Sequence, residues 1–189
     1  MNWLHHWLCR SDGWRRTIEH RVPWVLGDLD LGERILEIGP GPGVTTDILR
    51  SKVAHLTVLE LDPKLADSLR SRLDGGNVEV IAGSATAMPF SDSQFSAVAS
   101  LNMLHHVPFP ELQNRLLREV YRVLRPEGAF VGSDSRQGLL MQLIHIGDTL
   151  VPVDPDTFGE RLEAAGFQVE RIEKNREVFR FRARRPFRS

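Results

Sequence analysis

The sequence predicts an α/β fold in which helices cover both faces of a mostly parallel sheet, and the sheet ends in an antiparallel hairpin. From residue 34 onward, short apolar runs alternate with helical patterns, an order typical of parallel strands joined by crossover helices. Near the C-terminus, two apolar runs have only a short polar turn between them, so these two strands must pair antiparallel. Seven strands are expected in all.

The parallel part is expected to contain five strands and three helices. The fourth strand holds only small and apolar residues, as a strand buried on both faces should. Pro63 opens the second helix at a position that needs no backbone N–H, and the third helix carries an apolar stripe. The expected strands are 34–38, 56–61, 77–82, 96–101 and 129–133, and the expected helices are 44–50, 63–73 and 111–124.

The last third of the chain begins with a helix expected over 156–165. Gly166 follows it and suits the left-handed position that ends many helices. Strands over 167–172 and 178–183 then form the terminal hairpin. Between the third helix and the fifth strand, residues 125–128 are expected to form a turn.

Composition limits the classes of protein that this chain can be. Its 189 residues suit one domain, and a net charge of −1 gives no reason to expect a nucleic-acid or membrane partner. The single cysteine, Cys9, cannot form an intramolecular disulfide. No apolar stretch has the length of a signal peptide or a membrane span, so a cytoplasmic protein is predicted. The sequence carries no signal for an oligomeric state.

All four tryptophans lie before residue 30, at positions 3, 7, 14 and 24. On a helix, positions 3, 7 and 14 share one face. We expect residues 1–30 to form a helical cap that packs on the sheet or over the mouth of a pocket, with residues 31–189 forming the main domain. Two alternatives are peripheral contact with a membrane surface, because arginines lie near the tryptophans, and a docking face for a partner or substrate.

The most informative segment is Glu37-Ile-Gly-Pro-Gly-Pro-Gly43, directly after the first strand. Glycines at such a position let the backbone approach a ligand closely, and the helix that follows presents free N–H groups. Glu60 ends the second strand, where a carboxylate can accept hydrogen bonds from both hydroxyls of a ribose. Together these features predict a nucleoside site. A nicotinamide-dependent oxidoreductase is disfavoured, because its fingerprint requires glycine at position 44, which is valine.

The segment from Glu37 to Gly43 closely resembles the first motif of class I S-adenosylmethionine-dependent methyltransferases. The resemblance covers roughly residues 30 to 185 and implies a Rossmann-like fold, an S-adenosylmethionine-binding domain over residues 31–189 and methyltransferase activity. Further segments resemble other motifs of the family: Leu59–Pro63, Ala82–Phe90, Phe95–Val98, Leu101–Val107, Glu119–Gly128 and Leu162–Phe167.

The resemblance also implies which residues bind S-adenosylmethionine. The backbone of Gly39–Gly43 would pass beneath the methionine portion and ribose, and Glu60 would bind the ribose hydroxyls. Adenine would pack on Leu61 and meet Ser84 and the backbone N–H of Ala85. Asn102, at the end of the fourth strand, would line the pocket near the sulfonium. The implied cofactor-binding set is Glu37, Gly39, Pro40, Gly41, Gly43, Glu60, Leu61, Ser84, Ala85 and Asn102.

Two serines depart from the family pattern. The family usually has aspartate in place of Ser84 and commonly in place of Ser96. A hydrogen bond to a charged acceptor is about twice as strong as a neutral one, so weaker cofactor binding is expected from Ser84. These substitutions also motivate a second hypothesis, a non-catalytic cofactor-binding or interaction protein.

His105 and His106 are the predicted general base, which is needed only if the methyl acceptor must lose a proton. The alternative for either residue is a structural one, a hydrogen bond to backbone at the start of a helix. No metal site is predicted, because histidine pairs that are adjacent in sequence, including His5 and His6, lack the usual ligand spacing.

The acceptor is expected to be a small molecule. Enzymes that methylate exocyclic base nitrogens often carry Asn-Pro-Pro-Tyr after the fourth strand, whereas this chain has Asn102-Met-Leu-His105, so a nucleic-acid substrate is disfavoured. The Trp-rich N-terminus and an apolar helical cover expected within Gly138–Asp154 predict an apolar or amphipathic acceptor.

Overall fold

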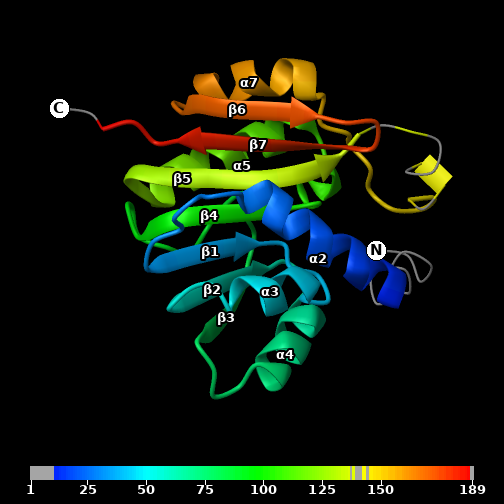
Figure 1. The fold of residues 1–189 in the computed structure, drawn as a ribbon, viewed down its shortest axis with the longest axis vertical. Coiled ribbons are helices and arrows are strands. Elements are labelled where there is room, and N and C mark those ends of the chain that lie inside the picture. Colours follow the sequence, from blue (N-terminus) through cyan, green and yellow to red (C-terminus); the bar gives the residue numbers. More distant parts are fainter. Residues whose placement is uncertain (1–10, 137, 139–141, 144, 188–189) are drawn as a thin grey trace.

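The computed structural model describes residues 11–136, 138, 142–143 and 145–187. Figure 1 shows one twisted sheet with helices on both faces. Its seven strands run in the order β3-β2-β1-β4-β5-β7-β6. The strands are β1 (Arg34–Ile38), β2 (His55–Glu60), β3 (Val78–Ala82), β4 (Phe95–Leu101), β5 (Leu124–Ser135), β6 (Gln168–Lys174) and β7 (Val178–Arg184). The helices are α2 (Asp12–Leu26), α3 (Val44–Leu49), α4 (Pro63–Arg72), the 3₁₀ turn η1 (Leu104–His106), α5 (Pro110–Val123) and α7 (Pro155–Ala164).

The predicted sheet is confirmed. Strands β1 to β5 pair parallel, and β7 pairs antiparallel with both β5 and β6. The predicted turn at 125–128 instead lies within the assigned span of β5, where Leu124 pairs with Phe95 before the register shifts. Glu127 adopts a positive φ of 64° there, and its N–H donates to the carbonyl of Arg185 at 2.7 Å. The chain therefore bends as expected while still pairing with its neighbours.

A separate hydrophobic core fills each side of the sheet. The first packs α5 and α7 on one face, and Phe130, Phe158 and Phe181 are among its largest side chains. The second packs α2, α3 and α4 on the other face. Helical layers on both sides explain why β1 and β4 are almost wholly buried, as parallel strands between two such layers are.

Helix α2 lies against the sheet. Ser11 caps it by accepting from the N–H of Trp14 at 3.2 Å, and Ile18 and Val22 are buried in the second core. Trp14 and Trp24 pack partly buried against the same core. Trp3, Trp7, His5, His6 and Cys9 lie outside the described residues. In the part of the chain that the structure describes, no helix has the length and apolar character needed to cross a bilayer.

The order of the sheet fixes where a ligand can bind. The chain winds outward from β1 toward β3 and then returns to β4 on the other side of β1, so the crossovers diverge between β1 and β4. In open α/β sheets, the crevice beyond the carboxyl ends of two such strands is where ligands bind. The arrowheads of β1, β4 and β5 point to this end in Figure 1, where one end of α2 and the segment after β5 also lie.

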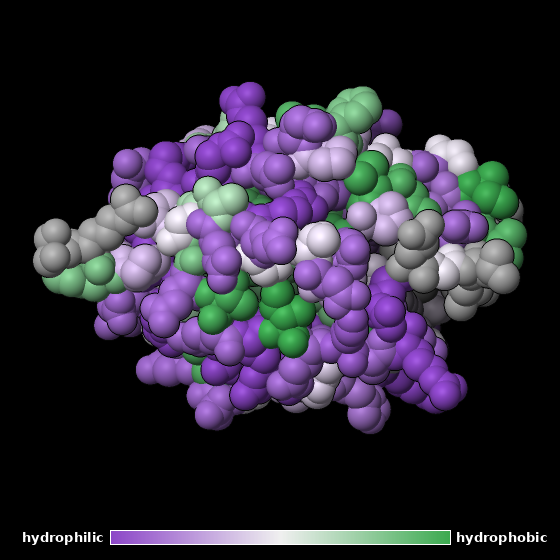
Figure 2. All heavy atoms as spheres, turned by 90° about the horizontal axis from the view of Figure 1, so that it is seen from above, coloured by the Kyte–Doolittle hydropathy of each residue, from purple (hydrophilic) through white to green (hydrophobic). Residues whose placement is uncertain are grey.

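Most of the surface around the α7–β6 edge is hydrophilic, as Figure 2 shows, but a group of hydrophobic residues lies toward the end of the molecule that carries the segment after β5. In that segment, Leu143 and Ile146 expose 59% and 68% of their surface.

Candidate active site

A cavity of about 1060 Å³ lies at the carboxyl ends of β1, β2 and β4. Helix α2 forms one wall with Trp14, Ile18 and Arg21, and η1 and the segment after β5 form another. The structure brings ten of the sequence-predicted residues together in its lining: Gly39, Pro40, Gly41, Glu60, Leu61, Ser84, Ala85, Asn102, His105 and His106. Glu37 and Gly43 are not part of the lining.

The glycine loop turns sharply between β1 and α3 because its glycines adopt backbone angles that other residues rarely reach. Gly39 has φ +65°, and a Cβ there would lie 2.2 Å from Cγ of Met103. Gly43 has φ +86° and caps α3, where a Cβ would meet Leu69 at 2.4 Å. Gly41 has φ +55° and nothing within 4 Å of its Cβ position, so its backbone faces open space in the cavity.

Glu60 ties the glycine loop to the end of β2. One carboxylate oxygen accepts from the N–H of Gly41 at 3.0 Å, and the other accepts from the N–H of Asp62 at 2.9 Å. Burial raises the pKa of this carboxyl, while these backbone hydrogen bonds oppose the rise. A carboxylate can accept about four hydrogen bonds, so both oxygens still have capacity for the two hydroxyls of a ribose.

Glu37 lies behind the cavity wall, where only 1% of its surface is exposed. Its carboxyl group accepts hydrogen bonds from the hydroxyls of Thr45 and, at 2.6 Å, Thr46, both in the first turn of α3. Burial raises the pKa of Glu37 to about 7. Its observed contacts therefore fix the start of α3, and Thr45 in turn lines the cavity.

The region beyond the ends of β2 and β3 presents an apolar side chain and a polar group to the cavity. Leu61 lines the cavity and exposes 71% of its surface, so its side chain is accessible to a ligand there. The hydroxyl of Ser84 lies 2.9 Å from that of Thr86 and accepts from the N–H of Thr86 at 3.2 Å. These features fit an adenine that packs on Leu61 with its polar edge toward Ser84.

Asn102 also tests whether the cavity fits S-adenosylmethionine. Its side-chain oxygen has a hydrogen-bond partner, whereas its side-chain nitrogen has none among the described residues. Its N–H donates to the carbonyl of Ser133 at 2.8 Å, and its Oδ1 accepts from Arg21 at 3.1 Å. Its Nδ2 is buried and has no hydrogen-bond partner among the described residues. A buried donor of this kind costs free energy unless a ligand or water satisfies it. The carboxylate of the methionine part of S-adenosylmethionine offers such an acceptor.

Ser96 lies away from the cavity, at the amino end of β4. Its hydroxyl lies 2.8 Å from the carbonyl oxygens of both Leu31 and Arg34, and it accepts from the N–H of Arg34 at 3.1 Å. Ser96 therefore joins β4 to the loop before β1. Its difference from the family aspartate concerns this loop and not the cavity lining.

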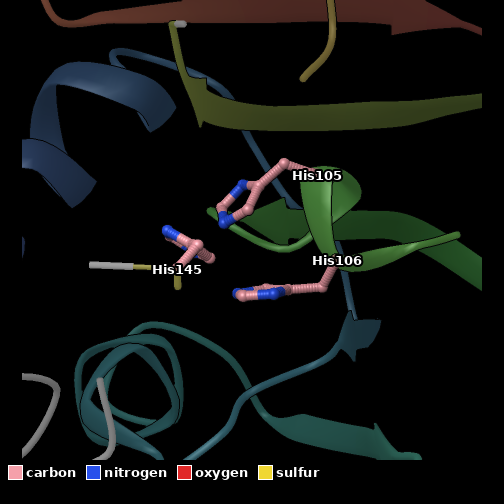
Figure 3. A group of neighbouring side chains, drawn as sticks. All are labelled: His105, His106 and His145. Atoms are coloured by element: carbon pink, nitrogen blue, oxygen red, sulfur yellow. The ribbon is translucent and has the colours of Figure 1, made fainter. Parts of the chain in front are cut away.

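The predicted base His105 is almost fully buried, and a carboxylate holds it. Its ring Nδ1 is hydrogen-bonded to Asp134 Oδ1, and its backbone N–H donates to Asp134 Oδ2 at 3.1 Å. Because a carboxylate only accepts, this bond places a ring proton on Nδ1, so that in the neutral ring Nε2 carries the lone pair. Figure 3 shows the rings of His105, His106 and His145 gathered around a common space.

Sequence reasoning missed three residues of this site: Arg21, Asp134 and His145. Asp134 lies near the carboxyl end of β5, and an acid at the end of a buried strand was the available signal. Arg21 and His145 carry no local signal. Only the packing of α2 and of the segment after β5 brings them to the cavity.

Comparison with known proteins agrees with this geometry. A family model described as a methyltransferase domain matches residues 36–132, which contain the glycine loop, Glu60 and both predicted histidines. YrhH of Bacillus subtilis (strain 168), which is named as a methyltransferase, is 32% identical over 143 residues, covering 68% of this chain and 77% of that protein.

A second relative is the fatty-acid O-methyltransferase of Mycolicibacterium smegmatis, 35% identical over 107 residues. That match covers 56% of this chain and only 38% of the relative. Among solved structures, a chain from the complex between the Haloferax volcanii Trm112 methyltransferase activator and a methyltransferase superposes with a TM-score of 0.80, covering 97% of this chain and 96% of that one. Its identity is 16%, so this likeness concerns the fold alone.

Proposed function

This chain belongs to the methyltransferase-domain family of S-adenosylmethionine-dependent enzymes, and from that premise we propose that it methylates a small apolar or amphipathic molecule. The observation that carries the proposal is the single cavity in which the Gly39–Gly41 backbone, the Glu60 carboxylate and an apolar wall from α2 meet. The cavity volume, about 1060 Å³, slightly exceeds the usual range of single-ligand sites and leaves room for a cofactor and an acceptor together.

In this proposal the cofactor lies over the carboxyl ends of β1 and β2. Glu60 accepts from the ribose hydroxyls, Leu61 packs on adenine and Ser84 meets its polar edge. The Nδ2 group of Asn102 binds the carboxylate of the methionine part, which lies over the backbone of the glycine loop. Support comes from the Nδ2 atom without a partner, the open space at Gly41 and the exposed side chain of Leu61.

S-adenosylmethionine supplies a methyl group on a positively charged sulfur. The acceptor atom attacks this carbon in line, the carbon–sulfur bond breaks, and its electron pair returns to sulfur. The protein contributes mainly by holding the acceptor in line, since orientation of this kind is worth up to about 7–11 kcal/mol in favourable cases. His105 and His106 lie on the wall where an acceptor proton would be removed.

The character of the walls supports an apolar or amphipathic acceptor. Trp14 and Ile18 from α2 line the cavity together with Val107 and Leu112, and Leu143 and Ile146 are exposed on the segment after β5. Arg21, Arg136 and Arg176 also line the cavity, so a carboxylate or hydroxyl head group could be bound at one end. The Mycolicibacterium relative is named for methylation of fatty acids, a substrate with this combination of groups.

Transfer of labelled methyl from S-adenosylmethionine to a panel of acceptors tests the proposal. The panel contains fatty acids of increasing chain length, an alkylated hydroquinone, a short hydrophilic carboxylic acid and bulk RNA. Turnover of a fatty acid or the hydroquinone, at least ten-fold above that of the short acid and RNA, is expected. Label that enters only RNA would refute the acceptor class.

The matched variants are Glu60→Ala and Glu79→Gln. Glu79 is an exposed acid on the neighbouring strand β3 and lies outside the cavity lining, so its variant should bind S-adenosylhomocysteine as the wild type does. Glu60→Ala should lose at least ten-fold in affinity, because two charge-assisted hydrogen bonds are removed. Equal affinities of the two variants would overturn the assignment of Glu60.

A further inference from the structure

Three histidines meet on the acceptor side of the cavity although they come from two separate segments. One ring nitrogen from each of His105, His106 and His145 can be chosen so that all three atoms lie within 4.8 Å of one another. His105 and His106 belong to η1, whereas His145 lies in the segment after β5. The rings surround a common space in Figure 3. Nitrogen ligands of this number occupy catalytic zinc sites, which keep a fourth position open.

The ring centres are spaced nearly as in such a site, whereas the ring nitrogens, which lie within 4.8 Å of one another, must come to about 3.3 Å apart around an ion. In a tetrahedral site with Zn–N bonds of about 2.0–2.1 Å, neighbouring imidazole centres lie roughly 5 Å apart. The centre of the His145 ring lies 5.1 Å from that of His105 and 5.1 Å from that of His106. The His105 and His106 centres are 4.1 Å apart, so these two rings must separate by about an ångström when an ion enters.

The surroundings of His105 are those of a metal ligand. Asp134, which is fully buried, holds Nδ1 of this ring and leaves Nε2 for an ion. Metal-bound histidines almost always donate their other N–H to a carboxylate or carbonyl in this manner, which fixes the ring and makes the ligand more basic. The Asp134 carboxylate also supplies a negative charge next to the cation.

The segment that carries His145 is tied to η1 by two further contacts. The N–H of Val151 donates to the carbonyl of His105 at 2.8 Å. The buried Nε2 group of Gln113 donates to the carbonyls of Leu104 at 3.1 Å and Val151 at 2.9 Å. These bonds hold the two segments together without any ion, so little ordering is needed when one binds.

We propose that His105, His106 and His145 bind a divalent transition metal ion, zinc foremost, with a fourth coordination position open to the acceptor side of the cavity. Imidazole ligands select zinc and its neighbours over magnesium or calcium, which prefer oxygen. The proposal departs from the sequence expectation of no metal site, because that expectation compared only histidines that are adjacent in the chain.

The role of the ion in methyl transfer rests on the proposed function. An acceptor hydroxyl bound at the open position would release its proton to solvent, because a zinc ion lowers the pKa of a coordinated oxygen. The resulting anion would then attack the methyl carbon, and the electron pair of the carbon–sulfur bond would return to sulfur. In this arrangement the histidines act as ligands and not directly as the base.

Metal binding is measured on the full chain, stripped with a chelator and free of any histidine tag. Competition with a chromogenic chelator should show one zinc ion per chain, and added Co²⁺ should give the visible absorption of a tetrahedral site. His145→Ala and His106→Gln should each lower zinc affinity at least ten-fold. His55→Ala, which removes an exposed histidine at the other end of the sheet, should leave it unchanged. The double variant His5→Ala, His6→Ala should also retain it.

Equal zinc affinity in the wild type and the cluster variants would overturn the site, as would loss of zinc only in the His5, His6 double variant. Asp134→Asn should lower the zinc affinity about 10–100-fold, because the carboxylate that orients the His105 ring is lost. Azide added to the Co²⁺ protein should shift its spectrum, and an unchanged spectrum would overturn the open position. Calorimetry with S-adenosylhomocysteine on the metal-free wild type tests the proposed function separately, since that binding does not require the ion.

Discussion

The carboxyl group of Glu37 should make the stability of this protein fall as the pH rises toward neutrality. Burial raises its pKa from a usual value of 4.5 to about 7. Between these two pH values the Glu37 carboxyl is protonated in the folded chain and ionised in the unfolded chain. Folding then takes up a proton, so the free energy of unfolding falls as the pH rises. The full effect is about 3 kcal/mol, of which roughly 2–3 kcal/mol falls between pH 5 and pH 8.

The substitution Glu37→Gln isolates this effect, because glutamine keeps the shape and cannot ionise. Relative to the wild type, the variant should gain about 2–3 kcal/mol between pH 5 and pH 8, which corresponds to roughly 5–10 °C in melting temperature for a chain of this size. Chemical unfolding at the two pH values measures the difference directly. Glu79→Gln on the surface of β3 is the control and should show no such trend. A variant-to-wild-type difference that is flat across this range would refute the buried, largely protonated carboxyl.

Three further predictions concern two glycine positions and the two serines that depart from the family pattern. Gly41 and Gly75 both have a positive φ and open space around their Cβ positions, so alanine at either should cost about 1–2 kcal/mol of stability. Only Gly41→Ala should lower the affinity for S-adenosylhomocysteine, at least several-fold, as measured by calorimetry. Equal affinities of the two variants would contradict the contact between Gly41 and the ligand. Ser84→Asp should raise the affinity for S-adenosylhomocysteine about five-fold, since a charged hydrogen-bond acceptor adds about 1 kcal/mol. An unchanged or weaker affinity would contradict the contact between residue 84 and adenine. Ser96→Asp should lower the free energy of unfolding by about 1–3 kcal/mol, because a carboxylate cannot donate to the carbonyl of Leu31. The affinity for S-adenosylhomocysteine should not change. Unchanged stability in urea unfolding would contradict this role of Ser96.

The sheet could be predicted because its signals are local. An apolar run and a glycine loop define β1, whose predicted limits agree with the structure, and Pro63 and Gly166 mark the ends of helices to within a residue or two. The segment at 125–128 was harder, because its pairing depends on Arg185, which is distant in sequence. Local chemistry predicts a bend there but not the strand partner that keeps it in the sheet.

The meeting of Gly39, Gly41 and Glu60 in one cavity could be predicted for the same reason, since these residues follow consecutive strands. The composition of the opposite wall could not be predicted. Asp134 meets His105 only because β4 and β5 are neighbours in the sheet, and His145 arrives from a segment with no motif of its own. Ser96 illustrates the opposite case, a residue singled out by comparison with a family pattern that the fold places at the far end of β4.

The crevice between β1 and β4 should bind S-adenosylmethionine through Glu60 and the glycine loop. A crystal structure of the chain with S-adenosylhomocysteine measures this directly. The ribose hydroxyls should lie within about 2.6–3.0 Å of the Glu60 carboxylate, with adenine against Leu61 and the amino-acid carboxylate near Nδ2 of Asn102. Ligand density elsewhere, or a Glu60 carboxylate that bonds only Gly41 and Asp62 in the complex, would contradict the account.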